Sequence, residues 1–121
     1  MAEAGDHMSE SKHVVCVSWD ANLAATRELL LKEAGCRVTS IVGPEYADRL
    51  PTLGQTNLLV LAHSVPRQQK QHILSLFRGT YPAPVLSLLG PNQTKLPDAD
   101  FAVEATSPAD FIRIVRQILA A

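Results

Sequence analysis

The chain has 121 residues and a formal net charge of −1, and 46% of its residues are hydrophobic and 19% charged. This composition is typical of one globular domain, and the lack of a basic excess argues against direct nucleic-acid binding. The longest apolar runs, such as 58–62, are too short to cross a bilayer, and no signal peptide is recognisable. We therefore expect a cytoplasmic protein with no membrane segment.

The N-terminal segment MAEAGDHMSESK is polar, small and without hydrophobic periodicity. We expect residues 1–12 to be a disordered leader and residues 13–121 to form the folded domain.

A strand, a helix and a second strand are predicted first. The valine-rich run 13–18 suits a strand that is buried on both faces. Asp20 is placed to cap the helix that follows, in which apolar residues recur at helical spacing and Arg27 lies on the opposite, charged side. Gly35 ends this helix with a left-handed backbone, and residues 37–42 alternate as a strand.

The middle of the chain predicts two more helices around a central strand. Proline opens a short helix over 44–50, and residues 57–62 form the most hydrophobic strand. Pro66 starts a third helix, with Ile73 and Phe77 among the residues facing inward. Its cationic side chains are expected in water: Arg67, Lys70 and Arg78.

The last third predicts two strands and one helix. Residues 84–89 and 101–104 are the strands, and the irregular stretch between them is too short for a helix with two connections. We expect that fourth helix to be shortened or absent. Ser107 and Pro108 resemble the start of a final helix.

Alternating strands and helices predict an α/β fold with a parallel, doubly wound sheet. Cys16 and Cys36 have no metal or redox spacing and are expected to be buried reduced thiols. His13 and His72 are expected to be solvated.

Four stretches carry a resemblance to a known family: VSWDANLAATRELLLKEAG, LLVLAHSVP, PVLSLLG and FAVEATSPADFIRIVRQIL. In order and spacing they resemble the receiver domain of two-component response regulators over residues 13–120. The resemblance implies a flavodoxin-like five-stranded sheet in the order 2-1-3-4-5 and a role in phosphorelay signal transduction.

The positions that match the family's functional residues are replaced. The two acidic residues that hold Mg²⁺ correspond to Ser18 and Trp19, and the phosphoryl-accepting aspartate corresponds to Ala62. The small hydroxyl residue that ends the fourth strand corresponds to Leu89, with Ser87 two positions earlier. The lysine that pairs with the phosphate corresponds to Glu104.

These replacements remove the chemistry of phosphoryl transfer. A hydroxyl binds a hard dication poorly, indole offers no lone pair, and a methyl group accepts no phosphoryl group. We therefore expect no catalytic residue, no metal and no cofactor. The resemblance then implies an atypical pseudo-receiver that is not an enzyme and acts through protein–protein contacts, with a homodimer left open.

A small-ligand sensor is the alternative. Its crevice at the carboxyl edge of the sheet is lined by Trp19, Asp20, His63, Ser64 and Gly90. Trp19 serves there either as a packing plug or as a stacking platform for a planar ligand. A residual enzyme using Asp20 and His63 is a further alternative, whereas a metal site formed with Ser64 and Glu104 lacks a ligand spacing.

Overall fold

The computed structural model describes residues 11–104 and 107–120. The predicted leader therefore lies outside the described residues, apart from positions 11 and 12. The folded part begins at position 13, where the first strand starts.

Five parallel strands form one sheet in the order β2-β1-β3-β4-β5, as predicted. The strands are β1 (His13–Ser18), β2 (Arg37–Val42), β3 (Leu58–Leu61), β4 (Val85–Leu89) and β5 (Phe101–Glu104). Their bounds differ from the predicted ranges by one residue at most at each end.

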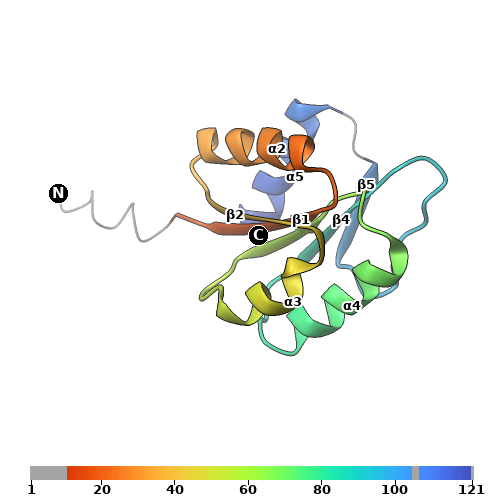
Figure 1. The fold of residues 1–121 in the computed structure, drawn as a ribbon. Helices are drawn as coiled ribbons and strands as arrows, with labels where there is room; N and C mark the ends of the chain where they lie inside the picture. Colours follow the sequence, from red (N-terminus) through yellow and green to blue (C-terminus); the bar gives the residue numbers. More distant parts are fainter. Residues whose placement is uncertain (1–10, 105–106, 121) are drawn as a thin grey trace.

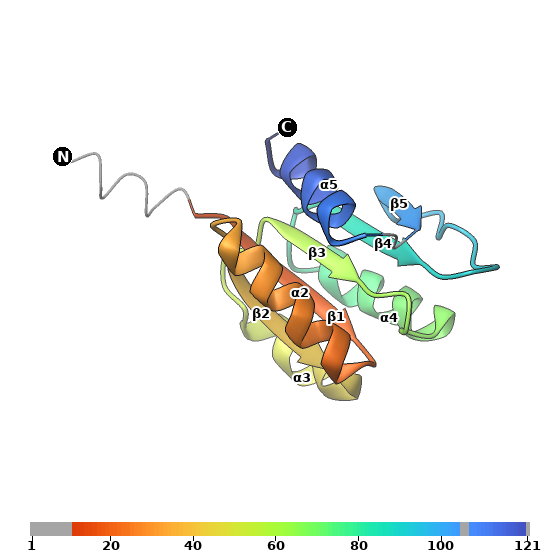
Figure 2. The same ribbon diagram turned by 90° about the horizontal axis from the view of Figure 1, so that it is seen from above.

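Helices cover both faces of this sheet. The helices α2 (Ala21–Glu33) and α5 (Pro108–Ala120) lie on one face (Figures 1 and 2). On the other face lie α4 (Arg67–Arg78) and the short α3 (Tyr46–Arg49), which is flanked by the 3₁₀ turns η1 (Gly43–Glu45) and η2 (Leu50–Thr52). The doubly wound α/β fold is confirmed.

The apolar core forms two layers, one on each face of the sheet. Successive residues of a strand point to opposite faces, so strands buried on both faces are apolar without alternation. The layer under α3 and α4 includes Val15, Val17, Leu59, Leu61, Ile73, Phe77 and Leu96. The layer under α2 and α5 includes Val14, Cys16, Leu31, Leu58, Val60, Leu86, Leu88 and Phe111.

The helix ends follow the predicted capping chemistry. The Asp20 carboxylate accepts hydrogen bonds from the Asn22 and Leu23 amides at 3.0 and 3.1 Å, which makes Asp20 the N-cap of α2. Gly35 follows that helix with φ +95°, a conformation that favours glycine. Pro66 is the N-cap of α4 rather than its first residue.

No helix lies between β4 and β5, in agreement with the prediction that this helix is shortened or absent. Residues 90–100, all of which the structure describes, form a loop that packs Leu96 into the core at 1% exposure. Arg78 holds the far end of this loop, donating to the Asp98 carbonyl at 2.9 Å and to the Asp100 carboxylate at 2.7 Å. A packed loop thus replaces the helix.

His13 was expected to be solvated but is buried, and Arg27 on the charged side of α2 is half-buried. His13 is only 5% exposed, and its ring nitrogens contact the Gln55 carbonyl and the Thr39 hydroxyl, both at 2.8 Å. The guanidinium of Arg27 is half-buried, 6.0 Å from the Phe111 ring. The prediction for His13 was wrong because partners distant in sequence cover its side chain.

The cysteines only partly follow the prediction. Both are free, but Cys16 is buried whereas Cys36 is half-buried. Burial raises the pKa of the Cys16 thiol to about 12, so it stays protonated and unreactive.

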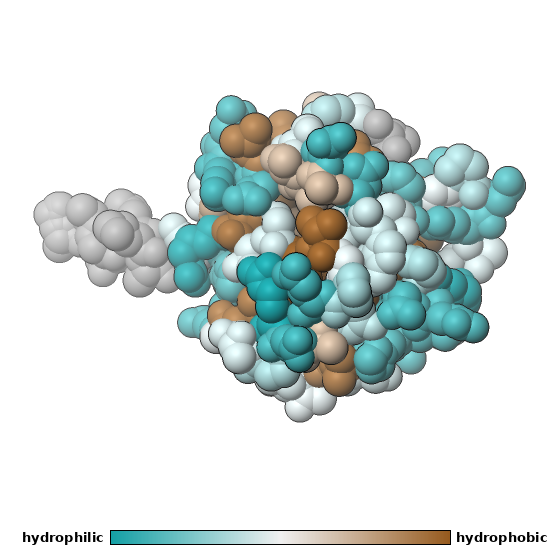
Figure 3. Space-filling view, viewed as in Figure 1, coloured by the Kyte–Doolittle hydropathy of each residue, from teal (hydrophilic) through white to brown (hydrophobic). Residues whose placement is uncertain are grey.

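The surface mixes polar and apolar side chains, as the face in Figure 3 shows. Among the residues that the structure describes, three large hydrophobic side chains are exposed: Leu23, Leu29 and Phe101. In the described ranges no helix is long and apolar enough to span a membrane.

Candidate functional site

The carboxyl edge of the sheet carries the predicted site positions. Ligands of open α/β sheets bind at this edge, where the connections after the strands lie side by side. Three connections contribute here: residues 19–20 after β1, residues 62–66 after β3 and residues 90–100 after β4.

A neutral hydrogen-bond network fills the end of β1. Ser18 is 1% exposed, and its hydroxyl lies 3.2 Å from the Ser64 hydroxyl. It also bonds the Asp20 backbone, donating to the carbonyl at 3.1 Å and accepting from the amide at 3.0 Å. Ser64 accepts from the Trp19 amide at 2.9 Å. Ser18 and Ser64 therefore satisfy each other and the surrounding backbone.

The Trp19 side chain packs away from this network. Its ring is half-buried and lies 6.1 Å from the Tyr46 ring, against the core layer under α3 and α4. Tyr46 donates to Gln69 Oε1 at 2.5 Å, and its oxygen lies 2.8 Å from His72 Nδ1. Trp19 thus has the contacts of a packing residue.

The remaining matched positions bring no acid to the end of β3. Ala62 is buried there, and Asp20 directs its carboxylate to the start of α2. Glu104 is paired with Leu89 in the register of β4 and β5 and is exposed. In the described part of the chain, no three His, Cys, Asp or Glu residues are grouped so as to hold a metal ion.

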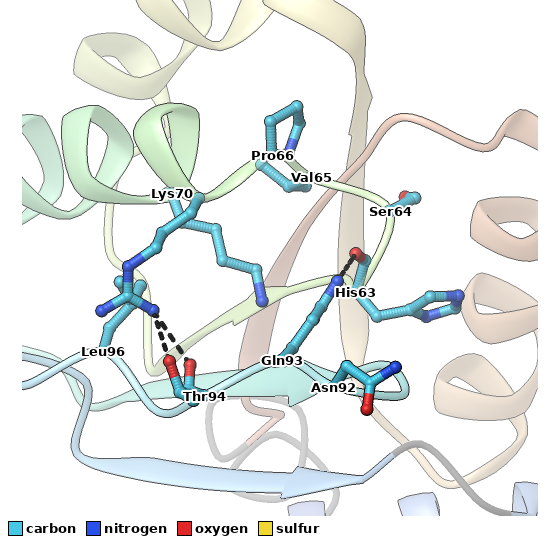
Figure 4. Close-up of a pocket in the computed structure, with 10 residues that line it drawn as sticks. His63, Ser64, Val65, Pro66, Lys70, Asn92, Gln93, Thr94 and Leu96 are labelled. Atoms are coloured by element: carbon cyan, nitrogen blue, oxygen red, sulfur yellow. Dashed lines mark hydrogen bonds between the residues drawn. The ribbon is translucent and has the colours of Figure 1, made fainter.

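A cavity of about 290 Å³ lies beside this network, between the start of α4 and the loop after β4 (Figure 4). It is lined by His63, Ser64, Val65, Pro66, Arg67, Lys70, Asn92, Gln93, Thr94 and Leu96.

Lys70 extends from α4 into this region and is 4% exposed. Its ammonium donates to the Ser87 hydroxyl and to the Leu88 carbonyl, both at 2.9 Å. Burial, with the nearby charge of Arg67, lowers the pKa of Lys70 from 10.5 to about 8. The expectation that Lys70 lies in water was wrong.

The sequence did contain a signal for this burial. Lys70 precedes Ile73, Leu74 and Phe77 at helical spacings of three, four and seven, which puts it on the buried face of α4. Because lysine is charged, it is expected in water even where the helical spacing favours burial. Its long apolar stem can nevertheless pass through a packed apolar layer.

Side-chain hydrogen bonds hold the loop after β4 against the cavity. Arg67 donates from Nη1 to the Thr94 carbonyl and hydroxyl, each at 3.1 Å. Gln93 accepts from the Gly90 amide at 2.9 Å and donates to the His63 carbonyl at 3.0 Å. The bond between Gln93 and His63 joins the loop after β4 to the connection after β3 (Figure 4), and the Arg67 bonds join the loop to the start of α4.

The five residues predicted to line one crevice do not all line the same cavity. His63 and Ser64 line the cavity beside α4. His63 and Gly90 also line a neighbouring cavity of about 270 Å³, which Glu104 borders. Trp19 and Asp20 line neither of these two cavities.

Comparison with known proteins supports the fold. No family model and no curated protein matches the sequence. Solved receiver domains do match its structure. One from Methylobacillus flagellatus has a TM-score of 0.74 at 15% identity, covering 89% of this chain and 98% of that one.

Two further structures agree. A response regulator receiver protein from Sinorhizobium medicae has a TM-score of 0.70 at 19% identity and covers 93% of this chain and 98% of its own. A response regulator receiver protein from Burkholderia phymatum has a TM-score of 0.74 at 18% identity and covers 91% of this chain and 96% of its own. The chain therefore has the fold of a response-regulator receiver domain.

Proposed function

We propose that this chain is an atypical receiver-like signalling module that is not phosphorylated by the usual aspartate and Mg²⁺ mechanism. The observation that carries the proposal is the neutral network at the end of β1. Ser18 and Ser64 occupy this position with their hydrogen bonds satisfied, and Ala62 directly follows β3.

The acidic groups nearby do not compensate. A divalent cation such as Mg²⁺ needs several oxygen ligands converging at close range. Asp20 uses its carboxylate to cap α2, and Glu104 is exposed at the end of the edge strand β5. A phosphoryl group at Ala62 would have no acceptor atom, because a methyl side chain carries no oxygen.

The module acts through protein–protein contacts in the cytoplasm and is not an enzyme. In support, the loop between β4 and β5 leaves part of the edge strand without a covering helix, and Phe101 is 42% exposed there. Such an edge suits a protein partner of a signalling pathway, or a second copy of this chain.

A direct chemical test uses acetyl phosphate, or beryllofluoride, with excess Mg²⁺. Intact mass and amide spectra of this protein should stay unchanged, while an active receiver treated in parallel forms its adduct. A stoichiometric adduct on this protein would refute the proposal. Sedimentation at several concentrations then decides whether the partner is a second copy.

A small-ligand sensor is a second candidate, and the cavity beside α4 favours it. The cavity is at the carboxyl edge of the sheet and is lined by residues of two separate chain segments, 63–70 and 92–96. Because Trp19 is not among its lining residues, we expect ligand binding to shift the amide signals of residues 63–70 rather than quench the indole directly.

A further inference from the structure

The cavity beside α4 carries positive charge that no acid balances. Lys70 and Arg67 line it, and none of the described residues that form its wall is Asp or Glu. We propose that this cavity binds a small tetrahedral dianion, namely inorganic phosphate or a phosphate monoester. The inference deepens the ligand-sensor candidate and rests on it, but it is independent of the proposed signalling role.

Lys70 is the centre of the argument. An ammonium group has three hydrogens, and Lys70 directs two of them to neutral acceptors, the Ser87 hydroxyl and the Leu88 carbonyl. The third has no acceptor among the described residues. A buried charge without a counter-charge is costly, so an anion placed beside it gains a strong, charge-assisted hydrogen bond.

The start of α4 adds a second donor group. This helix has 12 residues, and its N-cap Pro66 provides no side-chain cap. The first amides of such a helix have no intrahelical acceptor and carry the positive end of the helix dipole. The start of the helix borders the cavity, because Pro66 and Arg67 both line it. Anions bind at helix ends of this kind.

Arg67 supplies a third group. Its Nη1 atom donates to the Thr94 carbonyl and hydroxyl, which holds the guanidinium against the loop after β4, and Arg67 is one of the residues that line the cavity. The other guanidinium nitrogens make no hydrogen bond to the described residues, and arginine pairs readily with phosphate oxygens. The side chain both anchors the loop after β4 and presents free donors.

These features select the class of ligand. Every charged group at the wall is a donor, which favours an anion over a metal ion. Three separate donor groups match a tetrahedral oxyanion better than a planar carboxylate, which has only two oxygens. The volume of about 290 Å³ is at the lower end of ligand pockets and suits a small ligand.

The acidic residue that borders the neighbouring cavity does not cancel the positive charge of this site. Glu104 borders the neighbouring cavity together with His63 and is exposed to solvent. Water and salt screen an exposed charge much more than a buried one. The buried ammonium of Lys70 is therefore screened less than the Glu104 carboxylate.

The test titrates the ¹⁵N-labelled full chain with inorganic phosphate or with methyl phosphate. A parallel titration with sodium chloride at the same ionic strength is the control. We expect saturable shifts in the amides of 66–70 and 92–96, and none with chloride alone. Tighter binding of methyl phosphate would identify an ester as the ligand, and tighter binding of phosphate would identify the free ion.

Three variants make the test specific. Lys70→Met keeps the length of the side chain without its charge and should weaken binding at least about tenfold, or 1.4 kcal/mol. Arg67→Gln, at an exposed position, removes the guanidinium charge and should weaken binding severalfold. Arg37→Gln changes an exposed arginine at the amino end of β2, the opposite edge of the sheet, and should leave binding unchanged.

Two results would overturn the inference. Linear shifts that are spread over the surface, or binding that survives Lys70→Met, would show that the cavity is not an anion site. Saturable binding there of an uncharged metabolite, with no response to phosphate, would also reject the anion while leaving the ligand-sensor function intact.

Discussion

Two adjoining parts of the carboxyl edge have opposite electrostatic character. At the end of β1, Ser18 and Ser64 bond each other and the backbone, and the charged side chain of Asp20 is used as a helix cap. Beside α4, the buried Lys70 has only neutral partners and faces a cavity.

This difference distinguishes polar groups that serve packing from groups that can bind a ligand. Polar groups that satisfy one another stabilise a fold and leave nothing for a ligand to complete. A buried charge without a counter-charge weakens the fold until an anion arrives. By this criterion the place resembling the receiver's reactive site is closed, and the open site lies beside α4.

The largest expected effect comes from the wall of the cavity. Leu96→Ala removes a buried side chain of the loop after β4 and should lower the free energy of unfolding by about 2–5 kcal/mol. Lys95→Ala, at the exposed neighbouring position, should change it by less than about 0.5 kcal/mol. Urea denaturation measures both. Equal, small losses would mean that the loop is not part of the packed core.

Lys70→Met should stabilise the protein near pH 7 in phosphate-free buffer, by an amount on the order of 2 kcal/mol. The folded-state pKa of about 8 lies below the ordinary 10.5. Between these values the unfolded chain binds more protons, so the stability of the unaltered protein rises with pH. The variant should lack this rise.

Thermal or urea unfolding at pH 7, 9 and 10.5 measures the effect, with Lys32→Met as the exposed control. A stability difference between Lys70→Met and the unaltered protein that stays constant with pH would contradict an uncompensated ammonium at position 70.

Ser18→Ala should destabilise the protein by about 1–3 kcal/mol, because it leaves the Asp20 amide and the Ser64 hydroxyl without their partner. Ser75→Ala, on the exposed side of α4, should change stability by less than about 0.5 kcal/mol. Urea denaturation compares them. If Ser18→Ala is as mild as the control, the network does not hold the end of β1.

The smallest effect concerns Asp20. Asp20→Ala should cost about 1 kcal/mol through loss of the cap, whereas Asp20→Asn should cost almost nothing because asparagine caps equally well. Thermal unfolding with and without Mg²⁺ measures both variants. Stabilisation by Mg²⁺ that both variants abolish would make Asp20 a metal ligand instead.

The fold could be predicted because its signals are local. The apolar run of β3, the cap at Asp20 and the left-handed Gly35 are each contained in a few neighbouring residues. The missing helix could be predicted from the length of 90–100 alone. Strand order followed from the resemblance to receiver domains.

The candidate site could be predicted only in part, since it depends on contacts between distant residues. The sequence predicts His13 in water because its hydrogen-bond partners, Thr39 and Gln55, come from other segments and cannot be recognised locally. The direction of the Trp19 ring depends on Tyr46 in the same way. Lys70 is different, since its place on the apolar face of α4 could have been predicted from the period alone.

The most direct test of the closed end of β1 is a Mg²⁺ titration followed by two-dimensional amide spectra. The account predicts that the signals of Ser18, Trp19 and Ala62 stay in place at Mg²⁺ concentrations that saturate an active receiver. Saturable shifts centred on these three residues would contradict it, because they would show a divalent cation bound where the structure has only neutral, mutually bonded groups.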